Sequence, residues 1–568
     1  MGFGRHKLLY DKRGLALTTD NQIAVDAFDA TVEAFLASGR DTGPLLASLD
    51  ETDPNMLMGV CLRGYLMRMA SLIDLDIKSQ VALADAQRLC PGATTRERMH
   101  VDALASWCAG DLLKTGQIWE AILIDYPHDI LALRLAHNIH FFVGDIFRMR
   151  DSMARLMPRW SEETPGYGYV LGCRAFSLEE AGEYQQAEPI GRRAVELNEN
   201  DIWAGHAVAH VLEMQGRRKD GVEWINSHEK AWSKRGLFAK HLWWHRSLHY
   251  LEMNNFSAVL DAYDREFWVQ PSEDNIDICN SSSMLMRLHM LGVSVGDRWN
   301  SVAEVCSGRL HDRLRPFNDL HFVMALAMSG RKNEAQLIAT SMEDFVDNTE
   351  SEQVTLTGIY EKSAIPVAKA IIYYAEQNYS EVVRLMQESR YEMRPLGGSW
   401  AQRDVWVRML IESAVKDNKI SLTPEAQLLS DKFSSNKGKL PWPLEQGVII
   451  QKYGKQKHKV FGNIETYNNG INIATNKNAI IRSVFDGKIS RIFFIKGEGK
   501  AVLINHGEFF TVYSGLEEVK VKLGDNILSK EEIGRVLTRE NDNRTELHFE
   551  IWQGYDKQDP SLWLFEAF

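Results

Sequence analysis

Two groups of histidines in the first half of the chain have a spacing that places imidazoles on one face of a helix. His206 and His210 are four residues apart, and His241, His245 and His249 follow at the same interval. Residues four apart lie one turn from each other on the same helix face. Because neutral imidazole is the commonest side-chain ligand for zinc, these histidines could hold a metal ion or line a polar binding groove.

The same histidines also fit a structural role, in which each ring hydrogen-bonds to a neighbouring carboxylate or carbonyl group in the core. The sequence contains no HExxH motif. Glu213 continues the face of His206 and His210, but three successive turns of one helix lie too far apart to close on one ion. We therefore treat the five histidines as candidate groove-binding residues and assign none of them as a metal ligand.

The histidines lie in a region, residues 1–425, that reads as amphipathic helices separated by short polar breaks. The glycine in these breaks recurs 34 residues on, from Gly110 to Gly144 and from Gly182 to Gly216. This interval is the period of tetratricopeptide repeats, in which helical hairpins stack into an α-solenoid. The pattern places His206 and His210 on the first helix of a repeat, which lines the inner surface of such a solenoid.

A family resemblance becomes specific in four segments of this region: HNIHFFVGD (137–145), WAGHAVAHVLEMQGR (203–217), HLWWHRSLHYLEMNN (241–255) and NDLHFVMALAMSGR (318–331). They are similar to the tetratricopeptide repeat protein 38 family and its bacterial relatives, over about residues 1–425. The resemblance implies a helical repeat protein. It supplies no catalytic residues.

The character of the sequence changes towards the C-terminus. Residues 426–439 include the polar run DKFSSNKGK, which predicts a linker. Residues 440–568 then read as short strands separated by Gly, Asn and Asp turns, as in AIIRSVFDGKISRIFFI and FFTVYSGL. We predict a multidomain α + β protein, with an α-solenoid followed by a small, mainly antiparallel β domain.

Consecutive segments of the β region carry a second resemblance: KLPWPLEQGVIIQKYG, NNGINIATNKN, SVFDGKIS, VLINHGEFFTVYSGL and TELHFEIW. They follow the order found in LytM, or lysostaphin-type, murein peptidases, and they look most like the EnvC-like murein hydrolase activators. In active members this resemblance implies a zinc ion held by the His and Asp of HxGxD and by the second His of HxH. The zinc-bound water then attacks a murein peptide bond.

This chain departs from that pattern at four of the five chemical positions. Asn468 and Asn472 occupy the HxGxD ligand positions, and Gly515 and Glu546 replace the two histidines that orient the water. His548 alone is retained. Because one imidazole cannot hold a catalytic zinc, we predict no catalytic residue and interpret all five as vestigial peptidase positions.

Together the two halves predict a non-catalytic binding or scaffold protein rather than an enzyme. The solenoid would bind a protein partner or a ligand. The inactive LytM-like module would recognise a murein amidase or peptidoglycan itself. Two alternatives stay open: a zinc murein metalloendopeptidase with an altered ligand set, and a solenoid whose histidine-lined groove binds a metal or a small ligand. We predict no cofactor, with zinc as the alternative.

The compartment stays open. The N-terminus lacks the apolar core of a signal peptide, and no run of 18 apolar residues predicts a transmembrane segment. Six widely spaced cysteines suit reduced thiols of the cytoplasm, whereas a LytM-like module implies the periplasm or envelope. Residues 431–568 carry 15 Lys and 5 Arg against 18 acidic residues. Neither half has the basic patch that nucleic-acid binding requires.

Overall fold

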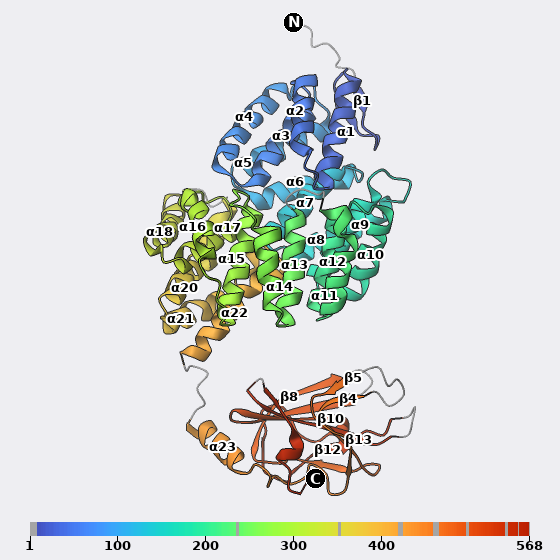
Figure 1. The fold of residues 1–568 in the computed structure, drawn as a ribbon. Coiled ribbons are helices and arrows are strands. Elements are labelled where there is room, and N and C mark those ends of the chain that lie inside the picture. The colour runs from blue at the N-terminus through green and yellow to red at the C-terminus, as the bar shows by residue number, and fades with distance from the viewer. Residues whose placement is uncertain are drawn as a thin grey trace. The chain divides into compact units, whose positions relative to one another are not determined.

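The computed structural model describes residues 8–233, 238–349, 354–417, 424–457, 465–495, 499–539, 544–554 and 556–566. The chain divides into two compact units, Met1–Lys419 and Ile420–Phe568. Figure 1 shows that the first unit is built mainly from helices and the second from strands. The predicted fold class, a helical array followed by an antiparallel β domain, is confirmed.

The helical unit consists of short helices joined by tight turns. Their bounds are α1 (Gln22–Leu36), α2 (Thr42–Thr52), α3 (Leu57–Ala70), α4 (Ile73–Leu89), α5 (Thr95–Cys108), α6 (Leu112–Asp125), α7 (Ile130–Phe142), α8 (Ile146–Leu156), α9 (Tyr167–Glu180), α10 (Tyr184–Leu197), α11 (Ile202–Met214), α12 (Arg218–Trp232), α13 (Phe238–Glu252), α14 (Phe256–Ala262), α15 (Asn275–Met290), α16 (Arg298–Cys306), α17 (Pro316–Met328), α18 (Lys332–Asn348), α19 (Thr355–Ile359), α20 (Ile365–Ala375), α21 (Tyr379–Ser389) and α22 (Trp400–Lys416).

Consecutive helices pair as hairpins, and the first helices of successive hairpins also pack on one another. Helix α9 contacts both α10 and α11, α11 contacts α13, and α13 contacts α15. Gly182 and Gly216, with φ of 81° and 67°, lie in the turns after α9 and α11. Glycine ends a helix readily here because it has no Cβ to clash in the left-handed conformation. The 34-residue recurrence of glycine therefore marks the equivalent turn within successive hairpins.

The helical unit also closes on itself, which the sequence does not predict. Helix α22 packs against α11 and α15 from the middle of the unit. The hydroxyl oxygen of Thr355 accepts a hydrogen bond from the backbone N–H of Leu112, 3.0 Å away. A Cβ at Gly144 would lie 2.2 Å from the carbonyl oxygen of Arg394. The late helices thus cover part of the inner surface formed by the earlier ones.

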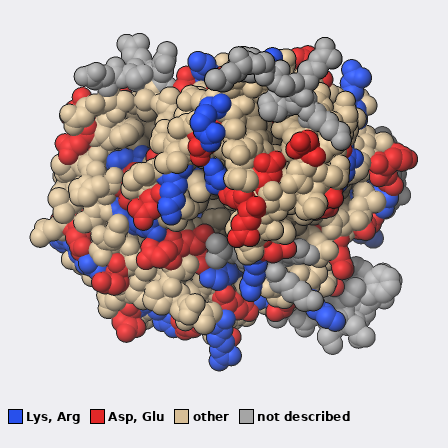
Figure 2. Space-filling model, turned by 90° about the horizontal axis from the view of Figure 1, so that it is seen from above, with Lys and Arg blue, Asp and Glu red and all other residues tan. Residues whose placement is uncertain are grey.

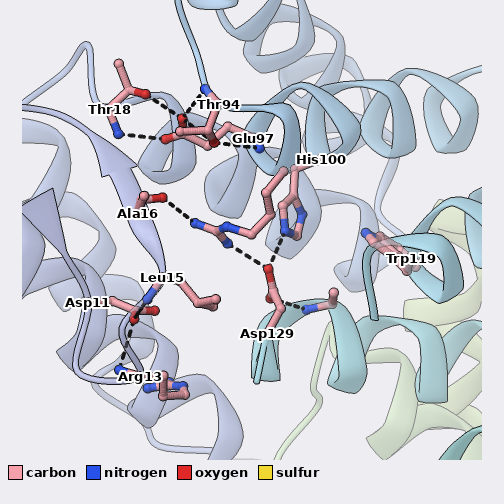
Figure 3. Close-up of polar contacts among 12 residues, drawn as sticks. Asp11, Arg13, Leu15, Ala16, Thr18, Thr94, Glu97, His100, Trp119 and Asp129 are labelled. Atoms are coloured by element: carbon pink, nitrogen blue, oxygen red, sulfur yellow. Dashed lines mark hydrogen bonds and ion pairs between the residues drawn. The ribbon is translucent and has the colours of Figure 1, made fainter. Parts of the chain in front are cut away.

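A small β-hairpin, absent from the sequence prediction, precedes α1 and is fixed by a buried polar network (Figure 3). Arg96 donates to the carbonyl oxygen of Ala16 at 2.9 Å and to a carboxylate oxygen of Asp129 at 2.6 Å. Glu97 accepts from the backbone N–H of Thr18 at 2.8 Å. The hairpin is therefore held to α5 and α7 by charged groups removed from water.

The strands are β1 (Leu8–Tyr10) and β2 (Ala16–Thr18) in the helical unit, and β3 (Val448–Gln451), β4 (Gly454–Lys457), β5 (Glu465–Asn468), β6 (Ile471–Ala474), β7 (Ile480–Arg482), β8 (Gly487–Ile495), β9 (Gly499–His506), β10 (Phe509–Val519), β11 (Asn526–Ile527), β12 (Glu532–Val536), β13 (Glu546–Gln553) and β14 (Asp556–Gln558) in the β unit. The main sheet has the order β11-β8-β9-β10-β13-β6-β3, and its pairs are antiparallel.

The prediction that residues 426–439 form a linker is wrong for most of this range. Helix α23 (Pro424–Ser435) occupies it. The side chain of Phe433 is fully buried. Its ring stacks on that of Phe509, with 4.8 Å between the ring centroids, and its centroid lies 5.4 Å from that of Trp563. A single buried aromatic residue in a polar stretch produces no apolar periodicity that would predict a helix. The composition alone therefore indicated a linker. Phe433 instead belongs to the core of the β unit.

Charged side chains of both signs are interspersed with uncharged residues on the face seen in Figure 2. Among the described helices, each is either too short or too polar to cross a lipid bilayer.

Candidate functional site

Three neighbouring strands of the β unit, β10, β13 and β6, carry four of the vestigial peptidase positions, and Asn468 lies at the end of β5. The register of the sheet aligns Asn472 on β6 with His548 on β13, and His548 with Ser514 on β10. Alternate residues of a strand face the same side of a sheet. These three side chains therefore lie in one row across one face, while Leu547 and Phe549 point into the core on the other face.

Asn468, Asn472 and His548 form one hydrogen-bonded cluster. The amide nitrogen of Asn468 donates to the amide oxygen of Asn472 at 3.2 Å. The Nδ1 atom of His548 lies 2.9 Å from that same oxygen, and its Nε2 atom lies 2.9 Å from a carboxylate oxygen of Glu550. Both ring nitrogens of His548 are therefore engaged with side-chain oxygens.

Glu550 is a site residue that the sequence analysis missed. It accepts a hydrogen bond from the indole N–H of Trp552 at 2.6 Å as well as contacting His548. Burial raises the pKa of Glu550, but hydrogen bonds from His548 and Trp552 outweigh burial and leave that pKa below its ordinary value. The alternation of His548, Glu550 and Trp552 along one strand was the available signal.

The other two vestigial positions lie outside this cluster. Gly515 has a φ of 88° and lies where the pairing of β10 with β9 shifts register between Ser514 and Leu516. Glu546 forms an ion pair with Arg539 at 3.2 Å. Gly470, at the centre of the former HxGxD segment, has a structural role, since a Cβ there would lie 2.2 Å from the carbonyl oxygen of Phe549.

The candidate groove histidines of the helical unit are buried rather than exposed in an open groove. His206 and His210 on α11, and His241 and His245 on α13, are between 0% and 4% exposed. Their ligand nitrogens lie within 4.8 Å of one another. His249 is also buried but lies outside this set and packs beside Gly221 of α12.

The sequence analysis weighed each histidine pair on its own helix and did not combine the two helices. His241 and His245 follow His206 and His210 by 35 residues each. This separation is one residue more than the glycine period, so it places the second pair at a nearly equivalent position on the next stacked helix. That was the signal that could have brought the four rings together.

A cavity of 660 Å³ lies inside the helical unit and is lined in part by His206 and His241. Arg134, Arg315 and Lys240 add positive charge to its lining. Burial lowers the pKa of Arg315 to about 10, which still leaves its guanidinium charged at neutral pH. The lining is otherwise largely aromatic and apolar: Phe35, Met69, Phe141, Phe142, Trp203, Phe238 and Phe317.

Among the described residues, sets of three or more His, Cys, Asp or Glu side chains close enough to share one ion occur in the helical unit. His548 belongs to none of these sets. The two units thus differ in chemistry: the β unit carries an amide-rich row with one imidazole, and the helical unit carries a buried histidine cluster beside a cavity.

Comparison with known proteins concerns the β unit. The family model of Peptidase family M23 matches residues 466–560. Cell division protein DipM of Caulobacter vibrioides (strain NA1000 / CB15N) is 30% identical over 131 residues, which are 23% of this chain and 20% of DipM. The chain thus spans only a fifth of the length of this curated relative.

Two solved structures are similar over the same share of the chain. One is Helicobacter pylori Csd3, 23% identical over 22% of this chain and 35% of Csd3, with a TM-score of 0.20. The other is a zinc-containing peptidase from Vibrio cholerae, 24% identical over 22% of this chain and 39% of that peptidase, with a TM-score of 0.20. The resemblance of the helical unit to the tetratricopeptide repeat protein 38 family stays a prediction. Within the C-terminal unit, residues 466–560 are similar to Peptidase family M23.

Proposed function

We propose that the chain is a murein-binding scaffold whose M23 domain recognises the cell-wall peptide without hydrolysing it. The observation that supports this most is the cluster of Asn468, Asn472 and His548. Amide groups stand where the family pattern has an imidazole and a carboxylate, and they hydrogen-bond to each other and to the remaining histidine.

Zinc chemistry explains why this cluster suits binding better than hydrolysis. Zinc in proteins is held by thiolate, imidazole or carboxylate groups, and a catalytic site keeps three such ligands and one open position. A neutral amide supplies neither the charge of a carboxylate nor the basicity of an imidazole. Gly515 and Glu546 also leave the water-orienting positions without imidazoles.

The row of polar and aromatic groups gives the domain a means of recognition. Trp552 lies opposite Phe510 in the register of β13 and β10, on the same face as His548 and Glu550. The ammonium group of Lys557 lies 5.1 Å from the ring centroid of Trp552. Amide, carboxylate and aromatic groups together can hydrogen-bond to a peptide backbone and pack against its side chains. The similarity to a protein named for cell division supports a role at the envelope.

A sedimentation assay with purified sacculi tests this proposal on the full chain. The unmodified protein and the variant Asn468→His/Asn472→Asp/Gly515→His/Glu546→His are expected to co-sediment with murein. Only the quadruple variant is expected to release soluble murein peptides, and only when zinc is supplied. Trp552→Ala is expected to weaken co-sedimentation, with the exposed Phe494→Ala on β8 as the matched control.

Three outcomes would contradict the proposal. Digestion of sacculi by the unmodified protein, stopped by a chelator, would show a zinc peptidase with an altered ligand set. Failure to co-sediment, together with stimulation of a murein amidase, would show that the domain binds a hydrolase instead. Equal co-sedimentation of Trp552→Ala and wild type would remove the proposed face from the binding surface.

A further inference from the structure

Four buried imidazoles from two stacked helices converge in the helical unit. The Nε2 atoms of His206 and His210 are 2.9 Å apart, and those of His241 and His245 are 3.2 Å apart. Ring centroids across the two helices lie at 5.0 Å for His206 and His241 and at 4.4 Å for His210 and His245. In a tetrahedral site with zinc–nitrogen bonds of about 2.0–2.1 Å, ligand nitrogens lie about 3.3 Å apart. The cluster therefore has nearly the dimensions of a four-nitrogen metal site.

Side-chain oxygens hold the outward nitrogens of two of these rings. The Nδ1 atom of His241 lies 2.9 Å from the amide oxygen of Asn280, and that of His245 lies 2.9 Å from a carboxylate oxygen of Glu213. The Nδ1 atom of His210 lies 3.3 Å from a carboxylate oxygen of Glu179 but forms no hydrogen bond with it. Metal-binding histidines characteristically donate their other ring N–H to such oxygens, which fixes the tautomer and the ring orientation.

This arrangement leaves lone pairs facing one another. When the Nδ1 atoms of His241 and His245 carry the hydrogens that Asn280 and Glu213 accept, neither Nε2 atom has a hydrogen to offer the other. Two lone pairs 3.2 Å apart repel unless a cation lies between them.

Two buried carboxyl groups next to the cluster lack hydrogen-bond partners. Glu179 and Glu180 are at most 1% exposed, and their four carboxylate oxygens have no hydrogen-bond partner among the described residues. Arg403 approaches Glu180 only to 4.0 Å, which is too long for a hydrogen bond. A divalent cation held by the four imidazoles would place positive charge beside these carboxyl groups.

We infer that His206, His210, His241 and His245 bind one first-row divalent transition-metal ion, with zinc as the tetrahedral example. Four imidazoles favour zinc, copper, nickel, cobalt or iron over magnesium or calcium, which prefer oxygen ligands. The cavity that His206 and His241 line gives the ion a route to a site that is otherwise buried. This inference does not depend on the function proposed for the β unit.

Metal reconstitution of the untagged full chain tests the inference. The protein is stripped with a chelator, dialysed against Zn²⁺ or Co²⁺ and analysed by elemental mass spectrometry and visible absorption. We expect one ion per chain, the intense absorption of tetrahedral Co²⁺, and a higher melting temperature with Zn²⁺ because binding to the folded state stabilises it. The variant His245→Gln is expected to lose uptake. His249→Gln, one turn further along α13 and outside the cluster, is the matched control and is expected to keep it.

A third variant separates metal binding from packing. Glu213→Gln retains the size of the side chain but replaces the carboxyl group that contacts Nδ1 of His245 with an amide, so we expect affinity to fall about 10–100-fold while the fold persists. If His245→Gln does not fold, the Co²⁺ spectrum of the wild type and the affinity of Glu213→Gln decide the question. No uptake by the folded wild type, or unchanged affinity in both His245→Gln and Glu213→Gln, would overturn the inference. Loss of uptake in His548→Gln would assign the ion to the β unit and would contradict both proposals.

Discussion

A carboxylate removed from water can be kept ionised by its neighbours, and Asp129 shows how. Arg96 and His100 both contact the same carboxylate oxygen, at 2.6 and 3.0 Å. Burial raises the pKa of Asp129, but the charges of His100 and Arg96 outweigh burial and hold that pKa well below 3.8. The backbone N–H of Ala132 adds a further hydrogen bond, because Asp129 is also the N-cap of α7.

The variant Asp129→Asn is expected to destabilise the helical unit by about 3–5 kcal/mol, because it leaves Arg96 buried without its counter-charge. Urea unfolding followed by far-ultraviolet circular dichroism measures the change. Asp102→Asn, at an exposed position on the same helix as Arg96, is the control and is expected to change stability by less than about 0.5 kcal/mol.

The pH dependence of stability follows from the same carboxylate. Because the pKa of Asp129 is lower in the folded than in the unfolded state, its contribution is complete above 3.8 and is lost as the pH falls further. Wild type should therefore lose stability on acidification below about pH 4 more steeply than Asp129→Asn. Parallel acid-unfolding curves for the two proteins would contradict the role assigned to this ion pair.

At the scale of the helices, close packing of small residues decides where a substitution is tolerated. Gly221 lies inside α12, and a Cβ there would come within 2.1 Å of His249 on α13. Alanine favours a helix by about 1 kcal/mol over glycine, whereas overpacking costs about 1–3 kcal/mol. We therefore expect Gly221→Ala to lower the melting temperature.

Gly168→Ala in α9 supplies the comparison. There the nearest atom to an added Cβ is 3.5 Å away, an ordinary contact, so we expect no loss of stability and a small gain. Differential scanning calorimetry of both variants measures the difference. A gain for Gly221→Ala as large as that for Gly168→Ala would show that α12 and α13 are not packed as described.

The helical hairpins could be predicted from sequence, because glycine positions and apolar periodicity depend on neighbours close in the chain. The closure of the unit could not be predicted, since it depends on contacts such as Leu112 with Thr355, which lie 243 residues apart. The histidine cluster falls between these cases. Each pair was visible as an i, i+4 pattern, but their meeting depends on how α11 stacks on α13.

In the β unit, a family pattern read residue by residue singled out Asn472 and His548, which the sheet register pairs with each other. It gave no reason to single out Glu550, whose role arises from hydrogen bonds to two neighbours on its own strand. The linker prediction was wrong because burial of Phe433 is a tertiary effect that composition does not record.

At the scale of the whole molecule, the two units should fold independently when the chain is divided at the correct place. A fragment of residues 424–568 retains α23 and the buried ring of Phe433, and we expect it to melt cooperatively. A fragment of residues 436–568 lacks that ring, and removal of a buried phenylalanine side chain alone costs about 3–5 kcal/mol.

Circular dichroism melts of the two fragments test this division. Equal stability of the two fragments would show that residues 424–435 act as the linker that the sequence analysis predicted. A fragment of residues 1–419 serves as the complementary half and should retain the helical signal of the full chain.

Helix α22 and its neighbours pack against earlier helices of the unit. This packing limits the size of the ligand that the helical unit can enclose. An open solenoid offers a long trough that accommodates an extended segment of another polypeptide. Here the interior space is 660 Å³, a size typical of small-molecule sites rather than of protein partners. A ligand of this cavity must therefore be compact, and the arginines of the lining favour a ligand that carries negative charge.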